Sequence, residues 1–596
     1  MITDAVRNQP TDPADAGDEL TAEHYIGLAT ESTGKQREQY LLKAAELLYQ
    51  RGDLSQAQSQ LQNLDSASLA RSRQNQINLL AAKIALANEN PRQALELLPE
   101  LNELPLDQYI DAREIDADAR LALGRPLEAV RIRDTLDRHL ETQEAREQNH
   151  EAIWAALQRT PTVSMHKQPD DSQSVKGWIE LAGILRNAQI NMSRMQDQIL
   201  DWGMRYPEHP VSNAFIDTLL NEYQSNYIPS ASIAILLPMQ GTYKNVADAI
   251  QGGILSAWYA DSRVDKPSLR FYDTSAADST VDDLYQKASL DGANFIIGPL
   301  DKDSINQLAD KSIIDIPMLT LNYAENPRIR TDNLYQFGLL PEDEAAQAAE
   351  LAIRDNHMNA AVLVPNSDWG RRLHDAFKKR YEELGGRVLT VQQYPTNVDD
   401  YSRPLRLLLN LDESQARHQD LQRILGTKLE FEPHRRQDID MIFLAATHRS
   451  ARGIVPALKF YRAGELPVYA TSHVYSGHID KAADRDLNGV TFCDLPWTLT
   501  TNSPLKAGFN TTWKDQRAYT RLFALGIDAY QLIQNLSYLE SYDYARFPGE
   551  TGNISLDENN RLHRELLWAK FKKGIPVYID LSLRPAPTPG NHAEKP

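Results

Sequence analysis

The sequence contains one cysteine, Cys493, among 596 residues. A single thiol excludes an intrachain disulfide and any zinc or iron–sulfur site built from several cysteines. Long apolar runs are also missing, since none approaches the roughly 20 residues of a membrane-spanning helix. Basic residues are outnumbered, with 63 Lys and Arg against 82 Asp and Glu, so the net charge is −19. Because such a surface repels phosphate backbones, the composition argues against nucleic-acid binding.

The beginning of the sequence lacks both the basic and the apolar stretch of a signal peptide, so the sequence as it stands predicts none. Residues 1–20 are rich in Asp, Ala, Pro and Thr and contain almost nothing to bury. We expect this segment to be a flexible tether, and residues 584–596 to be a flexible tail. The length of the whole chain predicts about four folding units.

Residues 21–228 have the pattern of stacked amphipathic helices, with apolar residues at three- and four-residue steps and few glycines. The small residues Ala57, Ala94 and Ala129 follow three short turns and lie 37 and 35 residues apart. This spacing resembles the 34-residue tetratricopeptide (TPR) unit and predicts a TPR-like helical solenoid, although most aromatic positions of that repeat are missing. The alternative is another all-α bundle in which the alanine spacing is coincidental. A solenoid typically holds another protein.

Residues 229–583 alternate between apolar strands and helices. The pattern predicts strands at 233–238, 269–272, 295–297, 318–321, 361–364, 388–393, 441–445, 467–470 and 490–493. Helices are predicted at 246–259, 281–290, 303–311, 342–355 and 369–384. Such alternation over about 350 residues predicts doubly wound parallel sheets in two lobes. The fold class is therefore α + α/β multidomain.

Ligands of doubly wound sheets bind at the carboxyl ends of the strands. The polar and aromatic residues at these ends are the candidates for a ligand pocket: Gln240, Gly241, Asp301, Asn322, Tyr323 and Trp369. The two aromatic side chains are suited to stacking on a sugar or peptide. The alternative is that these are the ordinary turn and packing residues of any α/β protein.

The sequence contains no Gly-x-Ser-x-Gly elbow, His-Glu-x-x-His pair, phosphate-binding loop or Gly-x-Gly-x-x-Gly fingerprint. It therefore predicts no enzyme and no cofactor. The spacing of His473, His478 and Asp480 suits neither a helix face nor alternate strand positions. We therefore expect these residues to be ordinary polar residues of a loop and not the ligands of a metal ion. The basic segment 434–436 lies among acidic residues, which favours an ion-pair network that holds an insertion at 399–438 onto a lobe.

Three segments resemble the type I periplasmic-binding-protein fold. They are the opening strand at 233–238 (IAILLP), residues 292–300 (GANFIIGPL) and residues 316–322 (IPMLTLN). The resemblance implies a two-lobed body for the α/β part of the chain.

A more specific resemblance is to the LppC/LpoA lipoprotein family. It is carried by residues 202–210 (WGMRYPEHP), 429–446 (LEFEPHRRQDIDMIFLAA), 466–472 (LPVYATS), 494–497 (DLPW) and 567–576 (LWAKFKKGIP). The resemblance implies a non-catalytic, outer-membrane-anchored protein of the periplasm that activates a class A penicillin-binding protein, the bifunctional peptidoglycan synthase. The sequence departs from the family at the missing lipid-bearing first cysteine, which Cys493 cannot replace, and at His434, where arginine is expected.

We therefore expect a regulator of peptidoglycan synthesis and cell wall biogenesis whose partner is a class A penicillin-binding protein. The main alternative is a periplasmic solute-binding receptor for an amino acid or muropeptide, which requires polar groups that converge from both lobes. An enzyme acting on cell-wall peptides is a third possibility, but it requires a catalytic constellation that the motifs do not provide.

Overall fold

The computed structural model describes residues 21–581, except 66–68, 191–194, 227–230, 264–265, 277–278, 312, 398, 428–429 and 502. The predicted tether and tail lie outside the described residues. The chain divides into two compact units. The first contains the residues up to 160 together with 165–179 and 208–210, and the second contains 161–164, 180–207 and the residues from 211 onward. The predicted domain boundary at 228/229 stays a prediction: it marks the change from helices to α/β structure, whereas the compact units divide within a helix.

The region from residue 21 to 226 is helical, as its periodicity predicts. Its helices are α1 (Ala22–Thr30), α2 (Gly34–Gln50), α3 (Leu54–Gln62), α4 (Arg71–Ala87), α5 (Pro91–Leu97), α6 (Leu106–Ala122), α7 (Pro126–Asp137), α8 (Gln143–Arg159), α9 (Gln173–Ile190), α10 (Met195–Arg205) and α11 (Asn213–Ser225). One of the divisions between the two compact units falls within α9, after Ile179. No helix of the described residues is both long enough and apolar enough to cross a membrane.

The repeat is visible in the turns between paired helices. Gly52, Glu89 and Gly124 occupy equivalent turns and all have positive φ, at 81°, 55° and 71°. In each repeat the small residue five positions later is buried, as Ala57 illustrates with 0% exposure. This confirms that each repeat is a helix, a tight turn and a second helix that approaches the first closely.

The first lobe of the α/β region contains a five-stranded parallel sheet in the order β2-β1-β3-β4-β5. Its strands are β1 (Ser232–Leu237), β2 (Ser268–Asp273), β3 (Phe295–Ile297), β4 (Ile313–Thr320) and β5 (Asp332–Gln336). The helices between them are α12 (Lys244–Ala260), α13 (Val281–Leu290) and α14 (Lys302–Ala309). Strands β1 and β3 are buried on both faces of the sheet, so their sequences are continuously apolar. This is why the apolar pattern predicts both strands.

The second lobe repeats this strand order. Its sheet runs β15-β14-β10-β9-β8-β6-β7, with β6 (Asn359–Pro365), β7 (Arg387–Tyr394), β8 (Met441–Leu444), β9 (Val468–Ala470), β10 (Thr491–Asp494), β14 (Leu567–Lys572) and β15 (Ile575–Ile579). Its helices include α15 (Pro341–Arg354), α16 (Asp368–Glu383), α17 (Ser402–Leu408), α18 (Leu411–Leu425), α19 (His448–Phe460) and α20 (Pro496–Leu499). Two lobes of the same winding confirm the predicted fold class.

The expectation of purely parallel sheets was wrong at one edge. β14 pairs antiparallel with β10, and β15 pairs antiparallel with β14. The second of these pairings follows from the two-residue turn at Lys573 and Gly574, both at positive φ, which joins neighbours that must run in opposite directions. A small antiparallel sheet of β11 (Phe547–Gly549), β12 (Gly552–Leu556) and β13 (Leu562–Glu565) was also not predicted.

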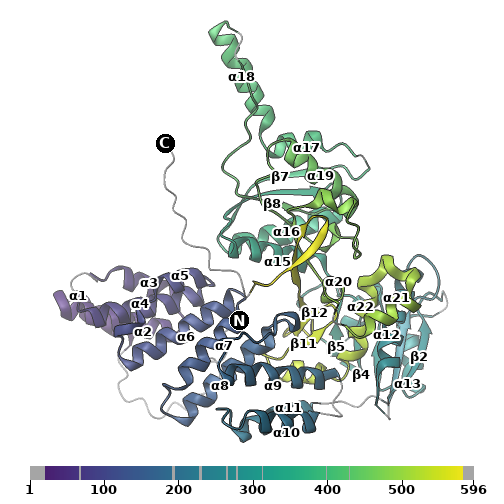
Figure 1. Ribbon diagram of the computed structural model, residues 1–596, viewed down its shortest axis with the longest axis horizontal. Coiled ribbons are helices and arrows are strands. Elements are labelled where there is room, and N and C mark those ends of the chain that lie inside the picture. The colour runs from purple at the N-terminus through teal and green to yellow at the C-terminus, as the bar shows by residue number, and fades with distance from the viewer. Residues whose placement is uncertain are drawn as a thin grey trace. The chain divides into compact units, whose positions relative to one another are not determined.

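The chain returns from the second lobe to the first through α21 (Leu505–Thr512) and α22 (Thr520–Leu532), followed by α23 (Leu536–Ser541). Figure 1 shows α22 beside α12, and two glycines permit this contact. A Cβ on Gly253 would lie 2.0 Å from the Phe523 carbonyl oxygen, and one on Gly526 would lie 2.1 Å from the Ile250 carbonyl oxygen. Only glycine therefore allows α22 to lie this close to the first lobe.

The predicted insertion at 399–438 contains α17 and α18, and α18 extends away from the sheet of the second lobe (Figure 1). Ion pairs hold its base: Arg435 pairs with Glu465, and Glu432 pairs with Arg462. Arg435 Nε also donates to the Arg462 carbonyl oxygen at 3.2 Å. The predicted ion-pair network that fastens the insertion to a lobe is thus confirmed.

Candidate functional site

The six predicted ligand residues lie at strand ends, but they differ in what their side chains do. Gln240 and Gly241 follow β1 and are exposed, with Gly241 at a φ of 78° in the turn. Asp301 begins α14, where its carboxylate accepts a hydrogen bond from the Ser304 amide at 2.9 Å. Asn322 Nδ2 donates to the Leu300 carbonyl oxygen at 3.3 Å. These contacts bring the turns after β3 and β4 together, and the ligand role of the six residues stays a prediction.

The two predicted aromatic residues are already in contact with the protein. Tyr323 is 2% exposed, its hydroxyl donates to the Leu562 carbonyl oxygen at 2.5 Å, and the Arg561 guanidinium lies 4.7 Å from its ring centroid. Burial raises the pKa of Tyr323. Trp369 lies in the second lobe with its ring 5.0 Å from that of His473. Tyr323 therefore joins the first lobe to β13, which is a packing role.

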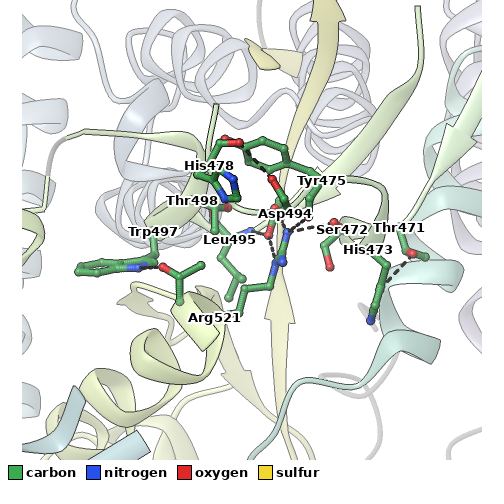
Figure 2. Close-up of polar contacts among 12 residues, drawn as sticks. Thr471, Ser472, His473, Tyr475, His478, Asp494, Leu495, Trp497, Thr498 and Arg521 are labelled. Atoms are coloured by element: carbon green, nitrogen blue, oxygen red, sulfur yellow. Dashed lines mark hydrogen bonds and ion pairs between the residues drawn. The ribbon is translucent and has the colours of Figure 1, made fainter. Parts of the chain in front are cut away.

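A buried polar group that motif searching missed lies at the ends of β9 and β10. We call it the Arg521 cluster: Glu344, Ser472, Tyr475, Asp494 and Arg521. Arg521 Nε donates to Asp494 Oδ1 at 2.9 Å and Nη2 donates to Oδ2 at 2.6 Å, a bidentate pair that Figure 2 shows. Nη2 also donates to the carbonyl oxygens of Ser472 and Tyr475 at 3.0 and 2.9 Å. Since Asp494 is 0% exposed, this charge pair is satisfied without solvent.

Glu344 brings a third element, α15, into the Arg521 cluster. Its carboxylate accepts hydrogen bonds from the Ser472 amide at 2.9 Å and from the Ser472 hydroxyl at 3.1 Å. Burial raises the pKa of Glu344 to about 7 because the charged form loses its hydration. The cluster therefore ties α15, the ends of β9 and β10, and α22 together.

The backbone of the segment before β14 is hydrogen-bonded to both lobes. The Gln336 backbone amide at the end of β5 donates to the Asn560 carbonyl oxygen at 2.9 Å. On the other side, Gln347 in α15 donates to the Arg564 carbonyl oxygen at 2.9 Å and accepts from the Leu566 amide at 3.0 Å. We call residues 557–566 the hinge strap, because it is held by the first lobe at one end and by the second lobe at the other.

Two titratable groups reinforce the region of the hinge strap. His563 lies 2.9 Å from Asp557 and 3.8 Å from Asp343, and these carboxylates raise its pKa to about 9. Asp528 in α22 accepts hydrogen bonds from the amides of Glu550 and Thr551, each at 2.7 Å. These contacts fix α22 against the small sheet and hold His563 as a cation at neutral pH.

The described residues contain no group of three or more His, Cys, Asp or Glu side chains arranged to hold a metal ion. The His473 ring instead packs at a tilt against the Trp369 ring, and its Nδ1 lies 3.3 Å from the Thr471 hydroxyl. Cys493 is buried, and burial raises the pKa of its thiol, so it does not have the thiolate character of a nucleophile. The Arg521 cluster thus has the chemistry of a structural clamp.

The family-like segments supply part of this clamp. Residues 466–472 end in Ser472, and residues 494–497 begin with Asp494, so both strand-end motifs carry residues of the Arg521 cluster. Arg521 itself lies in an amphipathic helix and belongs to no recognised motif. A signal for Ser472 and Asp494 was therefore present in the sequence, whereas no local signal indicated Arg521.

Comparisons with known proteins cover almost the whole chain. The family model described as “LppC putative lipoprotein” matches residues 15–574. Relatives named penicillin-binding protein activator LpoA include one from Photobacterium profundum, 27% identical over 566 residues and covering 92% of this chain and 90% of the relative. One from Vibrio cholerae is 26% identical over 588 residues and covers 96% of both chains.

Among solved structures, LpoA of Haemophilus influenzae has a TM-score of 0.51 at 23% sequence identity and covers 95% of this chain and 98% of that one. This likeness concerns the fold, including the combination of helical and α/β regions. Since the family model spans far more than half of the sequence, the chain belongs to the LppC family.

Proposed function

We propose that this protein is a non-catalytic regulator of peptidoglycan synthesis that binds and activates a class A penicillin-binding protein. The observation that carries the proposal is the extent of the match to proteins named penicillin-binding protein activator: 92% of this chain aligns with 90% of one such relative. The alignment includes both the helical repeats and the two-lobed body, so both regions of this chain have counterparts in the relative.

The chemistry of the body supports a regulator better than a catalyst. The Arg521 and Asp494 charges neutralise each other within hydrogen-bond distance, and the thiol of Cys493 is buried. A catalytic nucleophile needs an adjacent base and access to substrate. The buried thiol of Cys493 lacks that access, and we assign these groups a contribution to shape and stiffness.

Activation follows from differential binding. If the protein binds the active conformation of the synthase more tightly than the inactive one, the population shifts toward the active form. A tenfold shift needs about 1.4 kcal/mol of difference in binding free energy. The Arg521 cluster and the hinge strap fasten the lobes, so the body loses little conformational freedom when it binds. More of the interaction energy is then left for the difference in binding free energy between the active and the inactive synthase.

The proposed place of action is the periplasm, at its outer-membrane side. There the family's lipid anchor would hold the protein, while the helical repeats span part of the distance to the synthase. Fractionation of cells that express the complete gene product is the check on this part of the proposal. Recovery of the protein with inner membrane or cytosol would contradict it.

A purified-component assay tests the function itself. The protein is added to a class A penicillin-binding protein with lipid-linked precursor, and glycan polymerisation and peptide cross-linking are measured separately. We expect at least one rate to rise in a saturable manner. An Arg521→Met variant serves to test the role of the clamp, and an Arg371→Met variant at the surface serves as the matched control. Unchanged rates at saturating concentrations of the unmodified protein would contradict the proposal.

A further inference from the structure

A cavity of about 180 Å³ lies beside the first lobe, with Gln189 of α9 in its lining, and away from the predicted strand-end ligand residues. It is located where α12 ends, where α21 begins and where α22 ends. We call it the α12–α22 pocket. Its polar wall includes Tyr530, Gln531, Gln534 and Glu550, and its apolar wall includes Pro504 and Pro548. Nothing in the proposed function uses this pocket.

The opposite charges at the edge of the pocket neutralise each other. Arg263 Nε donates to both oxygens of the Asp261 carboxylate, at 3.0 and 2.9 Å, and the Tyr530 hydroxyl donates to the same carboxylate at 2.7 Å. The acid and the base are thus already paired. An ionic ligand would have to displace one of them, which disfavours strongly charged occupants.

Two side chains of the wall have hydrogen-bonding capacity that the described residues leave unused. Gln531 lies in the last turn of α22 and Gln534 in the turn that follows it, both are partly buried, and neither carboxamide forms a hydrogen bond to a described residue. Each carboxamide offers two N–H donors and one carbonyl acceptor in a plane. Close to them, Glu550 accepts a hydrogen bond from the Ser503 hydroxyl at one oxygen, and burial raises the pKa of its carboxyl group.

These groups match one ligand chemistry. A secondary amide presents an N–H donor beside a carbonyl acceptor, which complements a glutamine carboxamide, and an attached methyl group suits the proline wall. A volume of 180 Å³ is below the roughly 300–1,000 Å³ of pockets that hold a drug-sized ligand, so it fits a substituent rather than a large molecule. We propose that the α12–α22 pocket binds a small secondary amide, such as the acetamido group of an amino sugar or a single peptide bond.

The two sources of such an amide are distinguished by the choice of probes. The full chain is examined by saturation-transfer NMR with N-acetylglucosamine, with glucosamine, which lacks the acetyl group, and with N-acetylalanine methylamide. We expect the acetyl methyl of at least one amide probe to receive the strongest transfer and glucosamine to receive none. Preference for the sugar or for the peptide analogue then identifies the source. Absence of transfer to both amide probes, or equal transfer to glucosamine, would overturn the proposal.

A pair of variants locates the binding. In the double variant Gln531→Leu/Gln534→Leu, two glutamines are replaced by apolar side chains of similar size that cannot form hydrogen bonds. We expect the affinity for the amide probe to fall by about 10-fold or more. Gln307→Leu, at an exposed position of α14, is the matched control and keeps the affinity. Thermal melting of both variants shows that the fold is retained. Undiminished binding by the double variant would place the ligand elsewhere and refute the assignment.

Discussion

Arg521 and Asp494 form a bidentate ion pair between α22 and the end of β10, with N–O distances of 2.9 and 2.6 Å. The pair joins a helix that packs on the first lobe to a strand of the second lobe. Because Asp494 is completely buried, its charge depends on Arg521 for compensation. The remaining donor capacity of Nη2 is used by two backbone carbonyl oxygens.

We expect Arg521→Met to lower the free energy of unfolding by about 3–5 kcal/mol, since it leaves a buried carboxylate without a partner. Urea unfolding followed by tryptophan fluorescence measures the change. Arg371→Met is the control, because the ion pair of Arg371 with Asp368 is exposed at the surface and contributes about 1 kcal/mol or less. Equal effects of the two substitutions would show that the buried pair is not a clamp.

Glu344 predicts a pH dependence of stability on the acidic side. Its pKa is about 7 in the folded chain against 4.5 for the free side chain, so folding favours the neutral form. The unfolded chain releases this proton first as pH rises, and the free energy of unfolding therefore falls between about pH 4.5 and 7, by up to about 3 kcal/mol. Below and above this window the contribution of Glu344 does not change with pH.

Denaturant unfolding at several pH values compares the unmodified protein with Glu344→Gln. The variant cannot titrate at this position, so its stability profile should be flatter between pH 4.5 and 7. Glu350→Gln, on the same helix but nearer the surface, controls for the removal of one acidic group. If the profile of Glu344→Gln parallels that of the unmodified protein, the carboxyl group does not titrate with a raised pKa.

His563 predicts a second pH dependence of stability, at higher pH than that of Glu344. Its charged form is a cation, whereas that of Glu344 is an anion. The carboxylates of Asp343 and Asp557 raise its pKa to about 9 from 6.5, so folding favours the protonated ring. Its contribution to stability is complete below about pH 6.5 and is lost as pH rises through about 9. NMR titration of ¹³C-labelled histidine rings measures this directly, with His563→Gln to assign the signal. A midpoint at or below 6.5 would contradict the proposed pairing.

Sequence patterns predict the strands with continuous apolar residues and fail where polar residues pair across the lobes. Strand β5 begins with Asp332 and with Asn333 at a φ of 63°, a combination that resembles a turn in sequence. Strand β13 contains Arg564, whose carbonyl oxygen accepts a hydrogen bond from Gln347, 217 positions earlier in the chain. Local periodicity carries no information about such partners, and so β5 and β13 were not predicted.

The same reason limits prediction of the site. Tyr323 stands at a strand end, where an aromatic residue can meet a ligand, but its hydroxyl reaches Leu562, 239 positions further along the chain. Arg521 lies 27 positions from Asp494. Its helix can be recognised in the sequence from its apolar residues, but this pattern does not indicate that Arg521 has a buried partner. Family resemblance located Asp494 and Ser472 because it compares whole segments, and only the three-dimensional contacts added Arg521 and Glu344.

The glycine contact between α12 and α22 gives a prediction about packing. Gly253→Ala places a Cβ within 2.0 Å of a backbone oxygen of α22, so the helices must separate. We expect a loss of about 1–3 kcal/mol or more in the free energy of unfolding, as for other overpacked sites. Gly203→Ala in α10 is the control, because no atom lies within 4 Å of its Cβ position. No loss of stability in Gly253→Ala would contradict the close approach.

The repeat turns give a prediction about backbone conformation. Gly52 and Glu89 occupy equivalent turns at φ values of 81° and 55°, and nothing lies within 4 Å of a Cβ on Gly52. The effect of Gly52→Ala therefore comes from the left-handed backbone alone, and we expect a loss of about 1 kcal/mol. At the equivalent position, Glu89→Gly should be more stable than Glu89→Ala by a similar amount, because glycine adopts this conformation without strain.

Native-state hydrogen exchange of the helices on each side of the two turns measures these differences locally. Gly27→Ala is the control for the direction of the effect. Gly27 lies within α1 with open space around its Cβ position, and alanine there should raise the free energy of unfolding by about 0.5–1 kcal/mol. The prediction requires alanine to destabilise both turns and to stabilise α1. If alanine raises protection at Gly52 as it does at Gly27, the turn does not need the left-handed conformation, and the helix–turn–helix repeat is not built on it.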